Sequence, residues 1–201
     1  MLIALIVLIA LAVLAGVALA ISYNRFVKQR NQIRESWRQV DVELQRRYDL
    51  IPNLVEIVKG FAAHERQVLV AVIDARNQAE AVRQQPGISA AAQAQAEGQL
   101  QRAVGGLFAV AEAYPDLKSD QNFLALATQL AETEDRVASG RRYYNALVRT
   151  LNTRVEAFPS NLVATTFGFR SEEYFEVVDP TARGPVRLDL TGGQPTLPPG
   201  Q

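Results

Sequence analysis

The first part of the chain is defined by an unbroken run of hydrophobic positions. Residues 2–21, LIALIVLIALAVLAGVALAI, contain only apolar side chains and glycine. As an α-helix, about twenty residues span about 30 Å, the thickness of the hydrocarbon core of a bilayer. A cleaved signal peptide with an A-x-A motif at residues 18–20 is the alternative, but the run is longer than usual and no basic residue precedes it. We therefore predict an uncleaved transmembrane anchor over residues 1–21.

After the anchor, apolar residues follow a helical period, with steps of three, four and seven positions from Phe26 to Ile51. No helix-breaking residue separates this stripe from the anchor, so one helix is expected to leave the membrane and continue outward. It is predicted to end near Tyr48, because Asp49 is a suitable N-cap for a second helix that has Pro52 in its first turn.

Three further helices are predicted by the same periodicity. The second ends at the turn formed by residues 86–87, and Ser89 caps the third, which breaks at Pro115. Asp120 caps the fourth, whose apolar residues recur at every seventh position over residues 123–158.

Short connections between four amphipathic helices predict an all-α fold, in which the anchor continues into a long antiparallel four-helix bundle over residues 22–177. The turns at residues 49–53 and 114–120 are then expected to lie together at the end far from the membrane. Residues 158–169 return toward the lipid surface, where packing under the bundle is favoured over contact with the interface. Residues 178–201 are rich in Pro and Gly and are predicted to be a disordered tail.

Basic residues that follow the anchor predict its orientation. Arg25, Lys28, Arg30 and Arg34 come before the first acidic residue, Glu35. Because positive charge is retained on the cytoplasmic side of a membrane, the N-terminus is expected outside and the helical bundle in the cytoplasm.

Small residues recur every four positions within the anchor, at Ala12, Gly16 and Ala20. Such a face lets two membrane helices approach closely, which is one route to a homo-oligomer. Alanine-rich segments also produce this spacing by chance, so the homo-oligomer is an alternative and not the main expectation.

Composition excludes several kinds of chemistry. The 201 residues include no cysteine, which rules out disulfides, thiolate catalysis and Cys-ligated metals. Basic and acidic residues balance at 21 each, so nucleic acid is not an expected partner.

The single histidine, His64, invites a metal or acid–base interpretation. The metalloprotease pattern H-E-x-x-H begins with His64 and Glu65 but has Val68 at its last position. The Glu-x-x-His pattern of di-metal bundles also fails, because Phe61 stands three residues before His64. We therefore predict no catalytic residue, metal or cofactor, and expect a histidine in the core or at its edge, bonded to a neighbouring helix. A metal-dependent enzyme using His64 with Glu65 or Glu112 is the less favoured alternative.

Several charged residues fall at core-facing positions, and a buried charge is tolerated only when it is paired. We predict ion pairs between helices that fix the register of the bundle, with arginines at the bundle edge as the alternative. The expected structural polar network consists of Arg47, Asp49, His64, Glu65, Glu112, Glu134 and Arg141.

The order of several sequence blocks resembles the LemA family of bacterial membrane proteins. The matching blocks are YNRFV, RRYDLIPNLVEIVKGFAAHE, EAYPDLKSDQNF, TEDRVASGRRYYNALV and FPSNLVATTFGF, which begin at residues 23, 46, 112, 133 and 158. The resemblance implies a single N-terminal span with a helical bundle, a place in the bacterial inner (cytoplasmic) membrane, and no established enzymatic activity. It covers residues 21–176, although the Gln/Ala-rich segment 83–99 carries no family signal.

These observations favour a membrane-anchored, non-enzymatic scaffold or interaction protein. Its expected partners are membrane lipid, through the N-terminal helix, and other membrane or cytoplasmic proteins. Asn53, Asp116 and Lys118 are the candidate partner-binding residues, because the two distal turns hold the densest polar and proline content outside the tail. A membrane-remodelling homo-oligomer is the first alternative.

Overall fold

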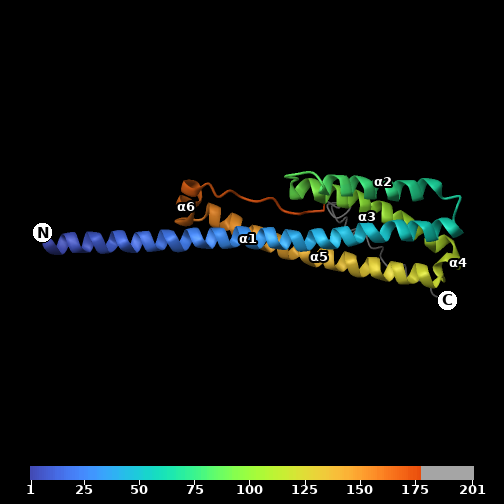
Figure 1. Ribbon diagram of the computed structural model, residues 1–201, viewed down its shortest axis with the longest axis horizontal. Coiled ribbons are helices and arrows are strands. Elements are labelled where there is room, and N and C mark those ends of the chain that lie inside the picture. The colour runs from blue at the N-terminus through green and yellow to red at the C-terminus, as the bar shows by residue number, and fades with distance from the viewer. Residues whose placement is uncertain (178–201) are drawn as a thin grey trace, which may run out of the picture.

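The computed structural model describes residues 1–177, which form six helices and their connections (Figure 1). The helices are α1 (Leu2–Phe61), α2 (Arg66–Arg83), α3 (Ala90–Ala113), α4 (Pro115–Lys118), α5 (Gln121–Glu156) and α6 (Ser160–Phe167). No strand occurs in this described part of the chain, so the predicted all-α class is confirmed. The tail predicted over residues 178–201 lies outside the described residues, and the predicted domain boundaries stay predictions.

The long helices form two pairs that share α1. Helix α1 packs along α5, α2 packs against α3, and the α2–α3 pair lies on α1. Figure 1 shows this pair over the C-terminal half of α1, whereas the N-terminal part of α1 extends alone. Helices α3 and α5 meet through side chains, such as the rings of Phe108 and Phe123 with centroids 6.2 Å apart, and not along a backbone seam. The antiparallel four-helix bundle therefore stays a prediction.

Helix α1 is uninterrupted from Leu2 to Phe61. All side chains of residues 2–21 are exposed, and burial begins only at Phe26. Within the described residues, α1 is the one helix that is long and apolar enough to cross a membrane, by length and composition. The prediction that one helix continues outward from the apolar segment is confirmed.

The predicted end of this helix near Tyr48 is wrong, and so is the N-cap assigned to Asp49. Pro52 lies inside α1, where it has no N–H to donate to the carbonyl of Tyr48, four residues earlier. Arg76 of α2 supplies the missing donor, because its Nε lies 3.1 Å from that carbonyl oxygen. The chain reverses at residues 62–65, and not at residues 49–53 where the turn had been predicted.

The other predicted helix starts are confirmed. Ser89 caps α3, because its hydroxyl accepts the N–H of Ala92 at 3.2 Å. Asp120 caps α5 in the same way, accepting the N–H of Phe123 at 2.8 Å. The break predicted after α3 is also present, but it holds the short helix α4.

Helices α1 and α5 lie close together at Gly140 of α5. A Cβ at Gly140 of α5 would meet Cγ2 of Val40 at 2.9 Å, which is closer than packed carbon atoms allow. Val40 is 1% exposed, so its side chain has no room to move away. Glycine at position 140 is therefore a requirement of this helix contact.

The segment 158–169 packs on one side and is uncovered on the other. Val163 and Ala164 are buried against α1 and α5, as expected for packing under the helices. Phe158, Leu162 and Phe167 are 80%, 58% and 54% exposed, so an apolar face remains uncovered beside the N-terminal part of α1.

After α6, residues 169–177 fold back along α5 without regular secondary structure, and we call them the strap (Figure 1). The side-chain amide of Asn152 both donates to and accepts from the backbone of Glu172, each at 2.9 Å. Asn145 pairs with Phe175 in the same way, at 3.1 and 2.9 Å. Seven helical residues and three extended ones both span about 10 Å, so the two asparagines hold the strap in register.

Candidate functional site

A cluster of polar side chains lies buried where α1, α3 and α5 meet, and we call it the Arg47 cluster. Arg47 is 2% exposed, with Nη1 2.7 Å from Glu97 Oε2 and Nη2 2.6 Å from Glu134 Oε1. The Tyr48 hydroxyl donates to Glu97. Gln93 Nε2 donates to the Tyr48 oxygen at 3.0 Å and to Glu97 Oε1 at 2.9 Å. One guanidinium thus joins carboxylates of two other helices.

Burial raises the pKa of two members of this cluster, Glu134 and Tyr48. Burial has the largest effect on the pKa of Glu134, which it raises. The positive charge of Arg47 opposes this increase, and the negative charge of Glu97 adds to it. Burial, followed by the negative charge of Glu97, raises the pKa of Tyr48 above its ordinary value. The phenol therefore stays protonated and acts as a hydrogen-bond donor.

The geometry of the Arg47 cluster suits assembly of the fold. The side chains of Arg47 and Glu97 are each 3% exposed, so neither can meet a substrate from solvent. Buried charges that are paired across helices favour one register over another, because any slip leaves a charge unpaired. The cluster therefore joins three helices at a single level of the molecule.

Among the residues of the expected polar network, Arg47 and Glu134 are brought together and Arg141 lies close by. Arg141 is half-buried on α5, one of the charges that lower the pKa of Glu134. Asp49 is exposed on α1, where its carboxylate accepts Nε2 of Gln45 at 2.7 Å.

Glu65 and Glu112 belong to the distal end of the molecule and not to the Arg47 cluster. Glu65 accepts the Tyr114 hydroxyl at 3.3 Å, which ties the α1–α2 turn to the end of α3. Glu112 forms an exposed ion pair with Lys118. The expected network is thus divided among separate places.

His64 lies exposed in the turn at residues 62–65. The expectation of a core or edge position is wrong, because α1 continues past Pro52 and places this residue beyond its end. Within residues 1–177, no three His, Asp or Glu side chains lie together so that they could hold a metal ion.

The candidate partner-binding residues do not form one corner. Asp116 and Lys118 are exposed on α4 at the distal end. Asn53 is exposed within α1, about two helical turns before its end, and its side chain donates to the carbonyl of Asp49 at 3.4 Å.

Sequence reasoning missed three members of the Arg47 cluster: Tyr48 of α1, and Gln93 and Glu97 of α3. Gln93 and Glu97 lie in an alanine-rich segment where small residues occupy every face, so the hydrophobic stripe is weak. A signal was present: Glu97 lies three and seven residues before the buried Leu100 and Val104, which is the core register of α3.

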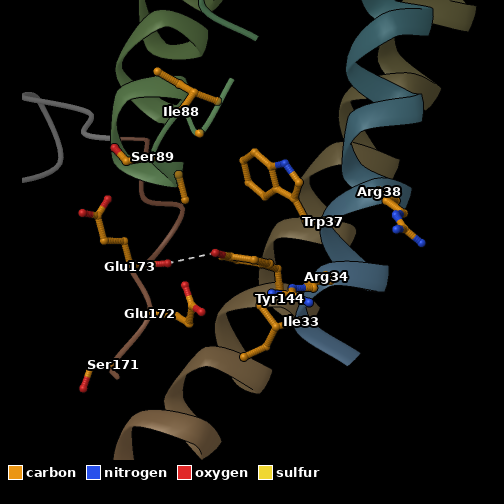
Figure 2. Close-up of a pocket in the computed structure, with 12 residues that line it drawn as sticks. Ile33, Arg34, Trp37, Arg38, Ile88, Ser89, Tyr144, Ser171, Glu172 and Glu173 are labelled. Atoms are coloured by element: carbon orange, nitrogen blue, oxygen red, sulfur yellow. Dashed lines mark hydrogen bonds between the residues drawn. The ribbon is translucent and has the colours of Figure 1, made fainter. Parts of the chain in front are cut away.

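A recess of about 540 Å³ opens between α1, the α2–α3 turn and the strap, and we call it the strap groove (Figure 2). Tyr144 of α5 donates its hydroxyl to the carbonyl of Glu173 at 3.0 Å, and its ring lies 5.3 Å from that of Trp37. Burial raises the pKa of Tyr144 to about 12, and the charges of Glu172 and Glu173 add to this. Arg34 also lines the groove, so charges of both signs surround an aromatic wall.

The structure defines a class: an all-α protein in which an uncovered apolar helix continues into packed helices fixed by a buried ionic cluster. A model of the LemA family matches residues 36–189. The chain belongs to the LemA family, as its sequence blocks had indicated.

Known relatives extend this assignment. Magnetosome protein MamQ 2 of Paramagnetospirillum magneticum is 32% identical, over 86% of this chain and 72% of the relative. Magnetosome protein MamQ of Magnetospirillum gryphiswaldense is 30% identical, over 84% and 71%. Protein LemA of Metamycoplasma hominis is 21% identical, over 70% and 63%.

Proposed function

We propose that this chain is a non-enzymatic scaffold anchored in the bacterial cytoplasmic membrane, whose helical bundle binds other proteins in the cytoplasm. The observation that carries the proposal is α1, one helix that joins an uncovered apolar segment to the packed helices without a break. A continuous helix fixes the distance and orientation of everything packed on it relative to the anchor, which is what a scaffold requires.

Charge supports the proposed orientation. Arg25, Lys28 and Arg34 are exposed and Arg30 is half-buried, all within four helical turns after the apolar segment. By the positive-inside tendency, these charges support an orientation with the packed helices on the cytoplasmic side and the N-terminus outside.

The buried charges support a role without catalysis. Arg47 forms ion pairs with Glu97 and Glu134 of two other helices, and the side chains of Arg47 and Glu97 are each only 3% exposed. In an active site we would expect such groups to face an open recess.

We place the main partner surface at the distal end, on the exposed side chains Asp116 and Lys118, with Asn53 farther along α1. Lys118 is held by its ion pair with Glu112, so its position is defined while its ammonium group stays accessible. The strap groove is an alternative partner site, because a polypeptide could enter it, and it is compared with the distal end in the experiment below.

Site-specific photocross-linking in native membranes tests this proposal. A benzophenone side chain is introduced at Lys118, at Arg38 in the strap groove, or at Arg142 on the exposed face of α5 as control. We expect discrete protein adducts from position 118 and none from position 142. Adducts from position 38 alone would move the partner site to the strap groove, and adducts from none of these positions would contradict the scaffold.

A second candidate function is membrane remodelling by a homo-oligomer. Ala12, Gly16 and Ala20 form an uncovered small-residue face, and a Cβ at Gly16 would meet nothing within 4 Å, so a second anchor has room to approach. The named magnetosome relatives are in keeping with a role at membranes. Disulfide cross-linking through Ala12→Cys, compared with Ala10→Cys on another face, would yield dimers from position 12 alone if this function holds.

A further inference from the structure

A recess lies at the point where α1 leaves its apolar segment. It has a volume of about 710 Å³ and is enclosed by α1, the end of α5 and α6. We call it the junction groove. Its floor is apolar, formed by Ala15, Ala18 and Leu19 of α1. Its rim is basic, formed by Arg25 of α1 and Arg154 of α5.

Both arginines are available to an anion. No ion pair within residues 1–177 involves Arg25 or Arg154, and no carboxylate lines the groove. The guanidinium of Arg154 lies 5.9 Å from the centre of the Phe26 ring, which holds it against α1. The rim therefore presents two positive charges with no negative neighbour in the groove.

The groove spans the boundary between apolar and polar chemistry. Arg25 lies four residues after the end of the apolar segment, about 6 Å along the helix, which is the level of lipid headgroups. Ala15 and Leu19 lie below it, at the level of acyl chains. The two kinds of lining thus follow the two ends of a phospholipid.

Aromatic and apolar side chains mark the same level. The ring of Tyr23 lies 5.0 Å from Phe167 and 5.7 Å from Phe169, and such rings are enriched where membrane meets water. Leu162 and Phe167 are exposed on α6, which is the arrangement of a helix that lies in the interface.

We propose that the junction groove binds one anionic phospholipid, with its phosphate between Arg25 and Arg154 and an acyl chain along Ala15, Ala18 and Leu19. The inference rests on the proposed insertion of α1 in a membrane. A free phosphate would find the same arginines but would leave the apolar floor uncovered, so the lining favours a lipid over a soluble anion.

Native mass spectrometry of the full chain in a non-ionic detergent tests the site. Phosphatidylglycerol or phosphatidylcholine is added, and lipid retained by the protein is measured. We expect wild type to retain phosphatidylglycerol, and Arg25→Gln/Arg154→Gln to retain about tenfold less, because it loses two charge-assisted contacts.

Two matched variants separate the site from general effects. Arg46→Gln/Arg142→Gln removes one exposed arginine from each of α1 and α5 far from the groove, and should retain lipid like wild type. Ala18→Trp fills the floor without changing charge, and should also lose retention. Circular dichroism confirms that each variant keeps its helix content.

The outcomes distinguish this inference from the proposed function. The lipid site would be overturned if wild type retained phosphatidylcholine as well as phosphatidylglycerol, or if the Arg46/Arg142 control lost as much lipid as the Arg25/Arg154 variant. Full competition by glycerol 3-phosphate would overturn it too. A separate experiment tests the anchor: membranes are washed at alkaline pH, and the protein that remains in them is measured. If wild type stays in the membrane without lipid preference, only the site is wrong; if it is extracted, the anchor is wrong and the site falls with it.

Discussion

At the scale of single residues, the Arg47 cluster restricts how α1, α3 and α5 can pack, because its ion pairs join all three helices. Arg47 could be recognised from sequence as a core-facing charge, and Glu134 as one acceptor, because both keep the helical register of buried neighbours. Glu97 could not be assigned as easily, since an alanine-rich helix leaves its buried face undefined until it packs.

Replacing Arg47 should destabilise the fold strongly. Arg47→Met leaves Glu97 buried without its charged partner, and we expect a loss of about 3–5 kcal/mol in the free energy of unfolding. Thermal and urea unfolding of the full chain in detergent, followed by circular dichroism, measures it. The neighbouring exposed residue provides the control: Arg46→Met should change stability by less than about 0.5 kcal/mol. Equal effects of the two variants would show that burial of the charge is unimportant.

The raised pKa of Glu134 predicts a dependence of stability on pH. Glu134 faces Arg47 and Glu97 from other helices, and Arg141 and Asp135 on its own. Because its pKa is higher in the folded state, its contribution to stability is fully present below the ordinary value of 4.5 and is lost as pH rises through the raised value.

Wild type should therefore gain stability relative to Glu134→Gln as pH falls from neutral toward 4.5. Parallel unfolding curves of the two proteins across this range measure the difference. Glu132→Gln, which changes an exposed carboxyl on the same helix, should follow wild type at every pH. A constant difference between wild type and Glu134→Gln would contradict the raised pKa.

At the scale of elements, helix starts were predictable and one helix end was not. Ser89 and Asp120 cap their helices through bonds to residues three positions later, which local sequence specifies. Pro52 was taken as the start of a helix, whereas it lies within α1 because Arg76 bonds the carbonyl that proline leaves free. That donor lies on another helix, so no local pattern reveals it.

A double-mutant cycle tests the compensation of Pro52 by Arg76. Arg76→Met should cost about 1–3 kcal/mol in wild type, because the Tyr48 carbonyl loses its donor. In a Pro52→Ala background the restored N–H can bond that carbonyl, so the same change should cost less. Arg76→Met also breaks the ion pair of Arg76 with Glu80, but it does so in both backgrounds. That loss therefore cancels when the two costs are subtracted. Equal costs in the two backgrounds would refute the compensation.

At the scale of the whole molecule, the sequence specified the class of protein better than its packing. The apolar segment, the basic flank and the helical periods were readable, because each depends on residues near in sequence. The packing of α1 against both α5 and the α2–α3 pair depends on residues that are far apart in the chain, such as Val40 and Gly140.

The orientation in the membrane can be tested with single cysteines, because the chain has none of its own. Leu2→Cys should react with a membrane-impermeant maleimide on intact spheroplasts. Ser119→Cys, exposed at the distal end, should react only after the membrane is permeabilised. The reverse pattern would place the packed helices outside and contradict the orientation drawn from the basic residues.

With its apolar segment in a bilayer, as proposed, the unbroken α1 would act as a lever that pivots in the membrane. From residue 22 to the end of α1 the helix runs about 60 Å, and membrane helices tilt by about 20° on average. A tilt of that size carries the far tip sideways by about 20 Å. A small change in bilayer thickness that alters the tilt would thus be amplified into a large change in the reach of the tip.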